Sequence, residues 1–130
     1  MTIIFGYWNI IVPARVAVEL QVFKAEFFKA LAHPLRIRIL EILRLGEHSV
    51  QELQAALRVE QSTVSQQLAL LRRQGIVSAR KEGTTVRYEI SDARVGQLLD
   101  VARAIFNTRL TGSQTMLREL RREGRRGGRR

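Results

Sequence analysis

Residues 49–75 read SVQELQAALRVEQSTVSQQLALLRRQG, and this stretch decides the fold. Ser49 and Glu52 have the spacing of a capping box, in which each residue satisfies a backbone N–H of the other at the start of a helix. After this short helix, residues 58–60 form a tight connection to a second helix over residues 61–74. Two helices joined by so short a turn predict a helix-turn-helix unit, whose second helix enters the major groove of DNA.

The second helix of this unit has one apolar and one polar face. At 100° per residue, Val64, Leu68 and Leu71 fall within about a 60° arc and are expected to face the core. The remaining surface carries hydroxyls and amides, which can hydrogen-bond to base edges, and no acidic side chain that would repel phosphate. Taken alone, such a face could equally be a solvated helix surface. The side chains that we expect to contact DNA from this helix are Gln61, Ser62, Thr63, Ser65, Gln66, Gln67 and Arg73.

The flanking sequence predicts further helices and a hairpin. Apolar residues recur at helical spacing over residues 16–31, and His33-Pro34 separates that helix from one over residues 34–43. Beyond residue 76, apolar and polar residues alternate on either side of Gly83, which is typical of a β-hairpin. The fold class is therefore mainly α with a β-hairpin wing, a winged helix-turn-helix. The wing residues expected to contact DNA are Arg80, Lys81, Thr85 and Arg87.

A last helix is expected from Asp92, as its N-cap, to about Leu110. This helix and the helix over residues 16–31 carry more apolar surface than a small core needs. We therefore expect a homodimer built through the first and last helices, with recognition helices about 34 Å apart on an inverted repeat. The residues expected at the dimer interface are Phe28, Leu99, Ala102 and Phe106.

The chain divides into three expected parts. Residues 1–15 form an apolar N-terminal extension, expected to pack on the body or on a partner subunit, and residues 16–112 form the DNA-binding domain with its dimerising helices. Residues 113–130 form an Arg/Gly-rich basic tail. From Arg118 onward this tail holds seven arginines and one strongly apolar residue, Leu120, so it is not expected to fold alone.

Composition narrows the possible functions. The 130 residues carry a formal net charge of +10, which indicates a polyanionic partner. The chain has no cysteine, so disulfides and thiol redox sensing are excluded, in keeping with a cytoplasmic, nucleoid-associated protein. An enzyme is not expected, because no catalytic His–carboxylate spacing or Gly-rich phosphate loop occurs. Membrane binding is not expected either, since the basic tail lacks an apolar face.

Five short segments resemble the ArsR/SmtB family of winged-helix repressors. They are FKALAHPLRIRIL (28–40), STVSQQL (62–68), GIV (75–77), RKEG (80–83) and VRY (86–88). The resemblance implies a dimeric repressor that leaves its operator when an effector binds. It also implies that residues 62–67 contact bases and that Arg87 contacts the DNA backbone.

This chain departs from the metal-sensing members of that family. Those members carry Cys-x-Cys in the short helix, where residues 48–52 here read HSVQE, or Asp and His ligands in the last helix, where residues 92–110 contain no histidine. We therefore expect no metal site and no cofactor, with His33 satisfied at a helix end and His48 solvated in a loop. The sequence does not identify an effector.

Three functions remain to be weighed. The leading one is sequence-specific control of transcription by a homodimer that binds double-stranded operator DNA. A sequence-independent nucleic-acid binder, driven by the basic tail, is an alternative. A winged-helix protein-interaction module is another, although the Ser/Gln face is unlike an interface core, which is rich in aromatic residues.

Overall fold

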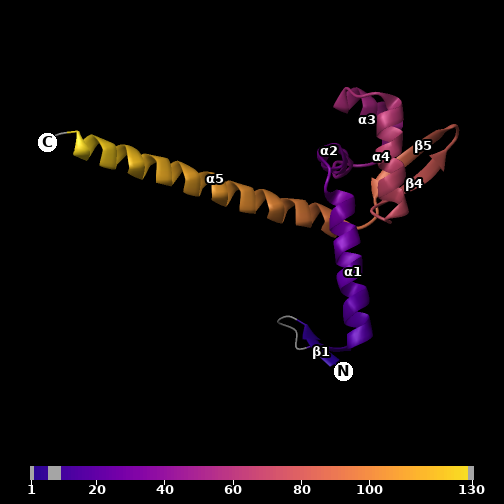
Figure 1. Ribbon diagram of the computed structural model, residues 1–130. Helices are drawn as coiled ribbons and strands as arrows, with labels where there is room; N and C mark the ends of the chain where they lie inside the picture. The colour runs from indigo at the N-terminus through magenta and orange to yellow at the C-terminus, as the bar shows by residue number, and fades with distance from the viewer. Residues whose placement is uncertain (1, 6–9, 129–130) are drawn as a thin grey trace. The chain divides into compact units, whose positions relative to one another are not determined.

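The computed structural model describes residues 2–5 and 10–128 and separates the chain into two compact units, Met1–Asp92 and Ala93–Arg130 (Figure 1). The first unit holds three helices around a small core, a longer N-terminal helix and two small sheets. The second unit consists of one long helix. The elements are β1 (Thr2–Phe5), β2 (Ile10–Pro13), α1 (Ala14–Leu31), α2 (Pro34–Leu43), β3 (His48–Ser49), α3 (Val50–Leu57), α4 (Gln61–Arg73), β4 (Val77–Glu82), β5 (Thr85–Ile90) and α5 (Arg94–Gly127).

The core lies where α2, α3, α4 and the start of β4 meet. Its largest fully buried side chains are Ile39, Leu40, Leu53, Val64, Leu68, Leu71, Ile76 and Val77. Three of them, at helical spacing, lie on α4. Full burial of an apolar side chain of this size stabilises the folded protein by about 1.5–3 kcal/mol. The predicted winged helix-turn-helix is confirmed.

The helix ends are capped as the sequence predicts. The Ser49 hydroxyl oxygen accepts a hydrogen bond from the Glu52 backbone N–H at 3.2 Å, so the capping box starts α3. His33 Nδ1 accepts from the Leu35 backbone N–H at 3.1 Å, which places this histidine as the N-cap of α2. At the other end of α3, Arg58 adopts a left-handed conformation (φ 56°) and turns the chain toward α4.

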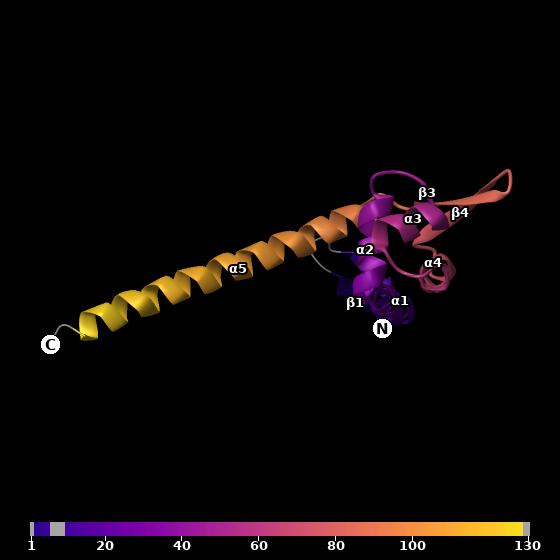
Figure 2. The ribbon, with the colours of Figure 1, turned by 90° about the horizontal axis from the view of Figure 1, so that it is seen from above.

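The wing is one strand larger than expected. Strands β4 and β5 pair in antiparallel register from Val77↔Ile90 to Glu82↔Thr85 around a two-residue turn, in which Gly83 has φ +61°. The short strand β3 adds to the free edge of β5, giving the order β3-β5-β4. The expectation that His48 lies in a loop is therefore wrong, because His48 pairs with Tyr88 in the sheet. The tip of the hairpin projects beyond helices α2–α4 (Figure 2).

The N-terminal region also differs from the expectation. Strands β1 and β2 form an antiparallel hairpin, with Thr2 opposite Pro13, where the sequence indicated only an apolar extension. Residues 6–9, which include Tyr7 and Trp8, lie outside the described part of the chain. Helix α1 follows directly at Ala14.

Helix α5 is longer than predicted at its C-terminal end. Its N-cap is Ala93 and not Asp92, so that expectation is wrong by one residue. The helix then continues to Gly127, where the sequence reading expected a basic tail without structure of its own. Residues 113–123 contain neither Pro nor Gly and are rich in Arg, Leu, Met, Glu and Gln, which favour helix, so the single glycine at residue 112 does not end it. Among the described helices, none combines the length and the hydropathy that a membrane-spanning segment needs.

The Ser49 cap gives a test of this local structure. Replacing Ser49 with Ala leaves the Glu52 N–H without its partner in a buried position, so we expect a loss of about 1 kcal/mol in the free energy of unfolding, measured by urea titration. Ser65→Ala, on the exposed surface of α4, is the control and should leave stability unchanged or slightly raised. Equal effects of the two changes would show that the cap does not stabilise the fold.

Candidate nucleic-acid interface

Helix α4 presents a polar surface because its apolar face is completely covered. Val64, Leu68 and Leu71 are each 0% exposed, which fixes the rotation of the helix about its axis. Of the residues predicted to contact DNA, the structure exposes Gln61, Ser62, Ser65, Gln66 and Arg73 and leaves Thr63 and Gln67 half-buried. The two half-buried residues lie one turn apart on the shoulder of the helix.

The start of α4 is held by the turn that precedes it. Glu60 is the N-cap, and its backbone carbonyl accepts hydrogen bonds from the N–H groups of Thr63 (3.1 Å) and Val64 (3.2 Å). No acidic residue lies in the first turn of the helix, and Arg72 and Arg73 lie in its last turn. Cations at this end interact favourably with the helix dipole.

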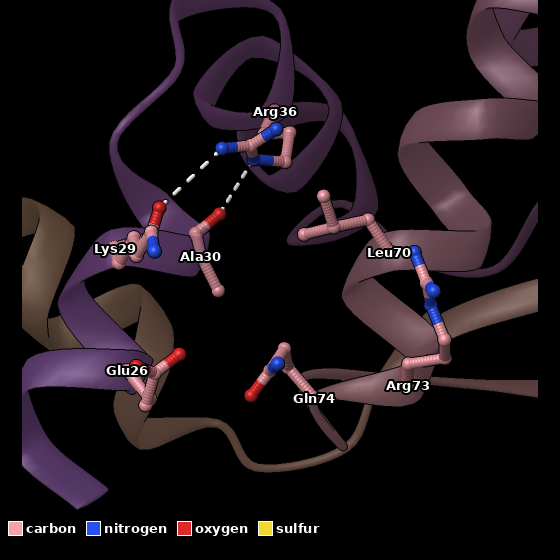
Figure 3. Close-up of a pocket in the computed structure, with 7 residues that line it drawn as sticks. All are labelled: Glu26, Lys29, Ala30, Arg36, Leu70, Arg73 and Gln74. Atoms are coloured by element: carbon pink, nitrogen blue, oxygen red, sulfur yellow. Dashed lines mark hydrogen bonds between the residues drawn. The ribbon is translucent and has the colours of Figure 1, made fainter. Parts of the chain in front are cut away.

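Gln67 is held by a residue that the sequence reading did not single out. Its Oε1 accepts a hydrogen bond of 2.9 Å from Arg36, near the start of α2. Arg36 also donates to the backbone carbonyls of Ala30 (2.6 Å) and Lys29 (3.4 Å) at the end of α1 (Figure 3). The bond to Gln67 joins residues 31 positions apart, so no local sequence pattern could have revealed it.

A cavity of about 300 Å³ opens between the end of α1 and the C-terminal half of α4 (Figure 3). Its wall includes one acidic and three basic side chains together with an amide and two apolar groups. The lining residues are Glu26, Lys29, Ala30, Arg36, Leu70, Arg73 and Gln74. Charged and amide groups therefore share the wall of the cavity with apolar ones, and the cavity lies beside the helix whose exposed residues are expected to contact DNA.

The predicted wing residues divide into two pairs. Arg80 and Arg87 are engaged in ion pairs, whereas Lys81 and Thr85 are exposed near the tip, and Lys81 has no ion pair within the described residues. Arg87 binds Glu52 on α3 (3.0 Å) and the Glu47 carboxylate (3.5 Å), and Arg80 binds the same Glu47 carboxylate (2.7 Å). We call these four residues, with Glu82, the wing charge cluster. It ties the hairpin to the start of α3.

The cluster changes the acidity of its carboxylates. A hydrogen bond from Arg80, reinforced by the charges of Arg80 and Arg87, lowers the pKa of Glu47 below its ordinary value of 4.5. For Glu52, partial desolvation acts to raise the pKa, but the hydrogen bond and charge of Arg87, together with hydrogen bonds from Ser49, lower it overall. Both groups therefore favour the ionised form more strongly in the folded protein.

The two histidines have backbone partners. His33 caps α2, and His48 Nδ1 lies 2.8 Å from the Gly46 carbonyl oxygen. In the part of the chain that the structure describes, no three His, Cys, Asp or Glu side chains are grouped as metal ligands would be.

The residues expected at a dimer interface differ in exposure. Phe28 on α1 and Phe106 on α5 are 53% and 62% exposed, and Ala102 is also exposed. Leu99 is only 8% exposed and offers little surface to a partner. Other apolar residues of these two helices are also exposed, including Val22 and Phe23 on α1 and Ile105 on α5.

A helix-turn-helix with a three-stranded wing and a polar second helix defines a winged-helix DNA-binding protein. Residues 33–79 match the family described as "Bacterial regulatory protein, arsR family". The chain belongs to this family, whose members are DNA-binding transcription regulators and not enzymes.

Individual relatives cover most of the chain. It is 46% identical over 102 residues to the HTH-type transcriptional regulator Rv0081 of Mycobacterium tuberculosis H37Rv, a match that spans 78% of this chain and 90% of that protein. It is 42% identical over 82 residues to the biofilm growth-associated repressor of Agrobacterium fabrum, spanning 63% and 70% of the two chains.

Solved structures give the same fold. The crystal structure of Mycobacterium tuberculosis Rv0081 matches with a TM-score of 0.66 at 47% identity, over 71% of this chain and 93% of that one. The solution structure of the homodimeric winged helix-turn-helix DNA-binding domain of Mycobacterium bovis Mb0332 matches with a TM-score of 0.67 at 32% identity, over 76% and 91%.

The wing charge cluster predicts a pH dependence of stability. Because the pKa values of Glu47 and Glu52 are lowered by folding, their stabilising contribution is present above about pH 4.5 and is lost as the pH falls through their folded values. We expect the double variant Arg80→Gln/Arg87→Gln to lose less unfolding free energy than the wild type between pH 7 and pH 3. Urea titrations at both pH values measure this.

Lys81→Gln is the matched control for the acid titration, because Lys81 is a cation of the same hairpin outside the cluster. It should lose as much stability as the wild type. If all three proteins lose the same amount, the carboxylates are not stabilised by Arg80 and Arg87.

Proposed function

We propose that the protein is a homodimeric repressor that binds an inverted-repeat operator, with α4 in the major groove and the wing beside the backbone. The observation that carries the proposal is the exposed face of α4. Ser62, Ser65 and Gln66 are exposed on a helix whose opposite side is fully buried, and hydroxyl and amide groups are suited to reading base edges. The repressor of Agrobacterium fabrum among the relatives supports repression as the outcome.

The exposed apolar surface of α1 supports the dimer. Val16, Leu20 and Phe23 follow one another at helical spacing along α1, and all three are exposed in the single chain. Phe23 also stacks on Phe27, with ring centroids 6.0 Å apart. Contiguous exposed apolar surface marks interaction sites, and the homodimeric Mb0332 domain supports a second copy of this chain as the occupant.

Within this proposal the wing residues have different roles. Lys81 and Thr85 are free to contact phosphate near the hairpin tip. Arg87 is only 26% exposed and is held by three glutamates, Glu47, Glu52 and Glu82, so it positions the wing more than it contacts DNA. This assignment refines the expectation that all four wing residues contact DNA in the same way.

A second candidate function, sequence-independent binding, is favoured by the end of α5. Arg118, Arg121, Arg122 and Arg125 lie three and four residues apart, on one side of the helix, and line one shallow concavity. Within the described residues none of these arginines forms an ion pair. Such a surface suits phosphate contact without sequence preference.

The two candidates are separated by a binding titration. The full chain is titrated against its own upstream DNA and against scrambled DNA at physiological salt, with and without a chelator. We expect at least a thousandfold preference for the upstream DNA that does not change with chelator. Gln66→Ala should weaken the specific complex by about 1–3 kcal/mol and leave the scrambled complex unchanged, because it removes a base contact and no phosphate contact.

Removal of residues 118–130 is the control for this titration. A sequence-specific regulator keeps its preference after the truncation, whereas a sequence-independent binder loses nearly all affinity. An equal effect of Gln66→Ala on both DNAs would contradict the role given to the exposed face of α4.

The dimer has its own test at Phe106. Phe106→Asp places a charge on exposed apolar surface of α5, which a second copy could cover only at a large desolvation cost. We expect the variant to sediment as a monomer at concentrations at which the wild type is a dimer. Asn107→Asp adds the same charge about 100° around the helix and should leave the dimer intact. A dimer that survives Phe106→Asp would place the interface elsewhere.

A further inference from the structure

Arg36 is held entirely by neutral oxygen atoms. Its guanidinium donates to the carbonyls of Ala30 and Lys29 and to Oε1 of Gln67. Within the described residues no carboxylate pairs with it. A guanidinium has five N–H donors and no acceptor, so each of its partners must turn an oxygen toward it.

The contacts with α1 fix where the guanidinium lies. Lys29 and Ala30 are in the last turn of α1, where the helix dipole is negative, and the Lys29 carbonyl also accepts the backbone N–H of the C-cap residue Ala32 at 3.2 Å. Two of the three bonds of Arg36 are made with these carbonyls, at 2.6 and 3.4 Å. The third hydrogen bond, to Gln67, is therefore made by a guanidinium whose position is already fixed by its contacts at the corner between α1 and α2.

This fixed group determines which way the Gln67 amide faces. Since Arg36 can only donate, the amide oxygen of Gln67 points toward α2 and its NH₂ group points away. Gln67 has no other hydrogen-bond partner within the described residues, so both N–H donors are available to a ligand. An amide that binds adenine in the bidentate manner needs its oxygen as well as its NH₂ group at the base edge.

We propose that Arg36 is a positioning residue that makes Gln67 a donor-only reader and thereby selects guanine over adenine at one position of each half-site. Guanine presents two acceptors, O6 and N7, in the major groove, whereas adenine presents one acceptor and one donor. Gln66, on the exposed surface of α4, is free to use both ends of its amide. Two adjacent glutamines thus have different base preferences because only one of them is held by an arginine.

This inference rests on the proposed function, and its test begins with the wild type. Binding sites are selected by the full chain from a random-sequence pool of double-stranded DNA and sequenced, and the same is done for Arg36→Met and Gln67→Ala. We expect the wild type to select guanine at one position of each half-site. Both variants should reduce the guanine-to-adenine preference at that position by about tenfold, and the double variant should show no further loss.

Two additional variants make the test independent of any folding defect. Gln67→Glu keeps an oxygen for Arg36 but replaces the NH₂ group by a second oxygen, so the preference should change to cytosine, whose amino group donates. Arg38→Met, two residues along α2, removes an arginine whose bond to the Leu57 carbonyl is 3.4 Å long, and it should leave every position unchanged.

The outcomes separate this inference from the function on which it rests. A wild-type protein that selects no sequence at all overturns the proposed function. A wild type that selects a site, together with Arg36→Met and Gln67→Glu variants that select the same bases at every position, overturns only the role of Arg36. Loss of preference at all positions equally in Arg36→Met would also overturn it, since that result describes general support of the fold.

Discussion

The burial of Val64, Leu68 and Leu71 beneath α4 is the constraint on which the rest of the structure depends. These three side chains occupy about a 60° arc of the helix, and covering them fixes the rotation of the helix about its axis. The rotation of α4 therefore also fixes the direction in which its polar side chains point. Ser62, Ser65 and Gln66 are exposed because the opposite side of the helix packs against the core.

Polar contacts add what apolar burial cannot specify. Dispersion and hydrophobic burial hold α4 in place but do not set the orientation of an amide, because they have little directionality. Hydrogen bonds are directional, and they are found at the edges of the helix-turn-helix. Arg36 orients Gln67 on one side of α4, and the wing charge cluster joins the hairpin to α3 through Glu47, Glu52 and Arg87.

The sequence predicts the parts of the fold that depend on neighbouring residues. The capping box at Ser49, the turn at Arg58 and the core face of α4 all follow from spacings of a few residues, and all are confirmed. The contacts that were missed are long-range. Arg80 and Glu47 are 33 positions apart, and Arg36 and Gln67 are 31 apart, so no periodicity records them. The length of helix α5 was not predicted for another reason: the basic tail holds one strongly apolar residue, Leu120, which indicates that it cannot fold alone, whereas the helix-favouring residues before its glycines extend the helix to Gly127.

Net charge and exposed apolar surface have opposite effects on the association of two copies of the chain. A net charge of +10 opposes close packing of two copies, whereas the exposed aromatic residues of α1 and α5 favour it. In the proposed dimer DNA relieves this conflict, because phosphates neutralise the basic residues of each copy while leaving the apolar surfaces free to pair. Dimerisation and DNA binding are then linked, since each stabilises the form that the other requires. The affinity of the dimer is accordingly expected to be higher on operator DNA than in free solution.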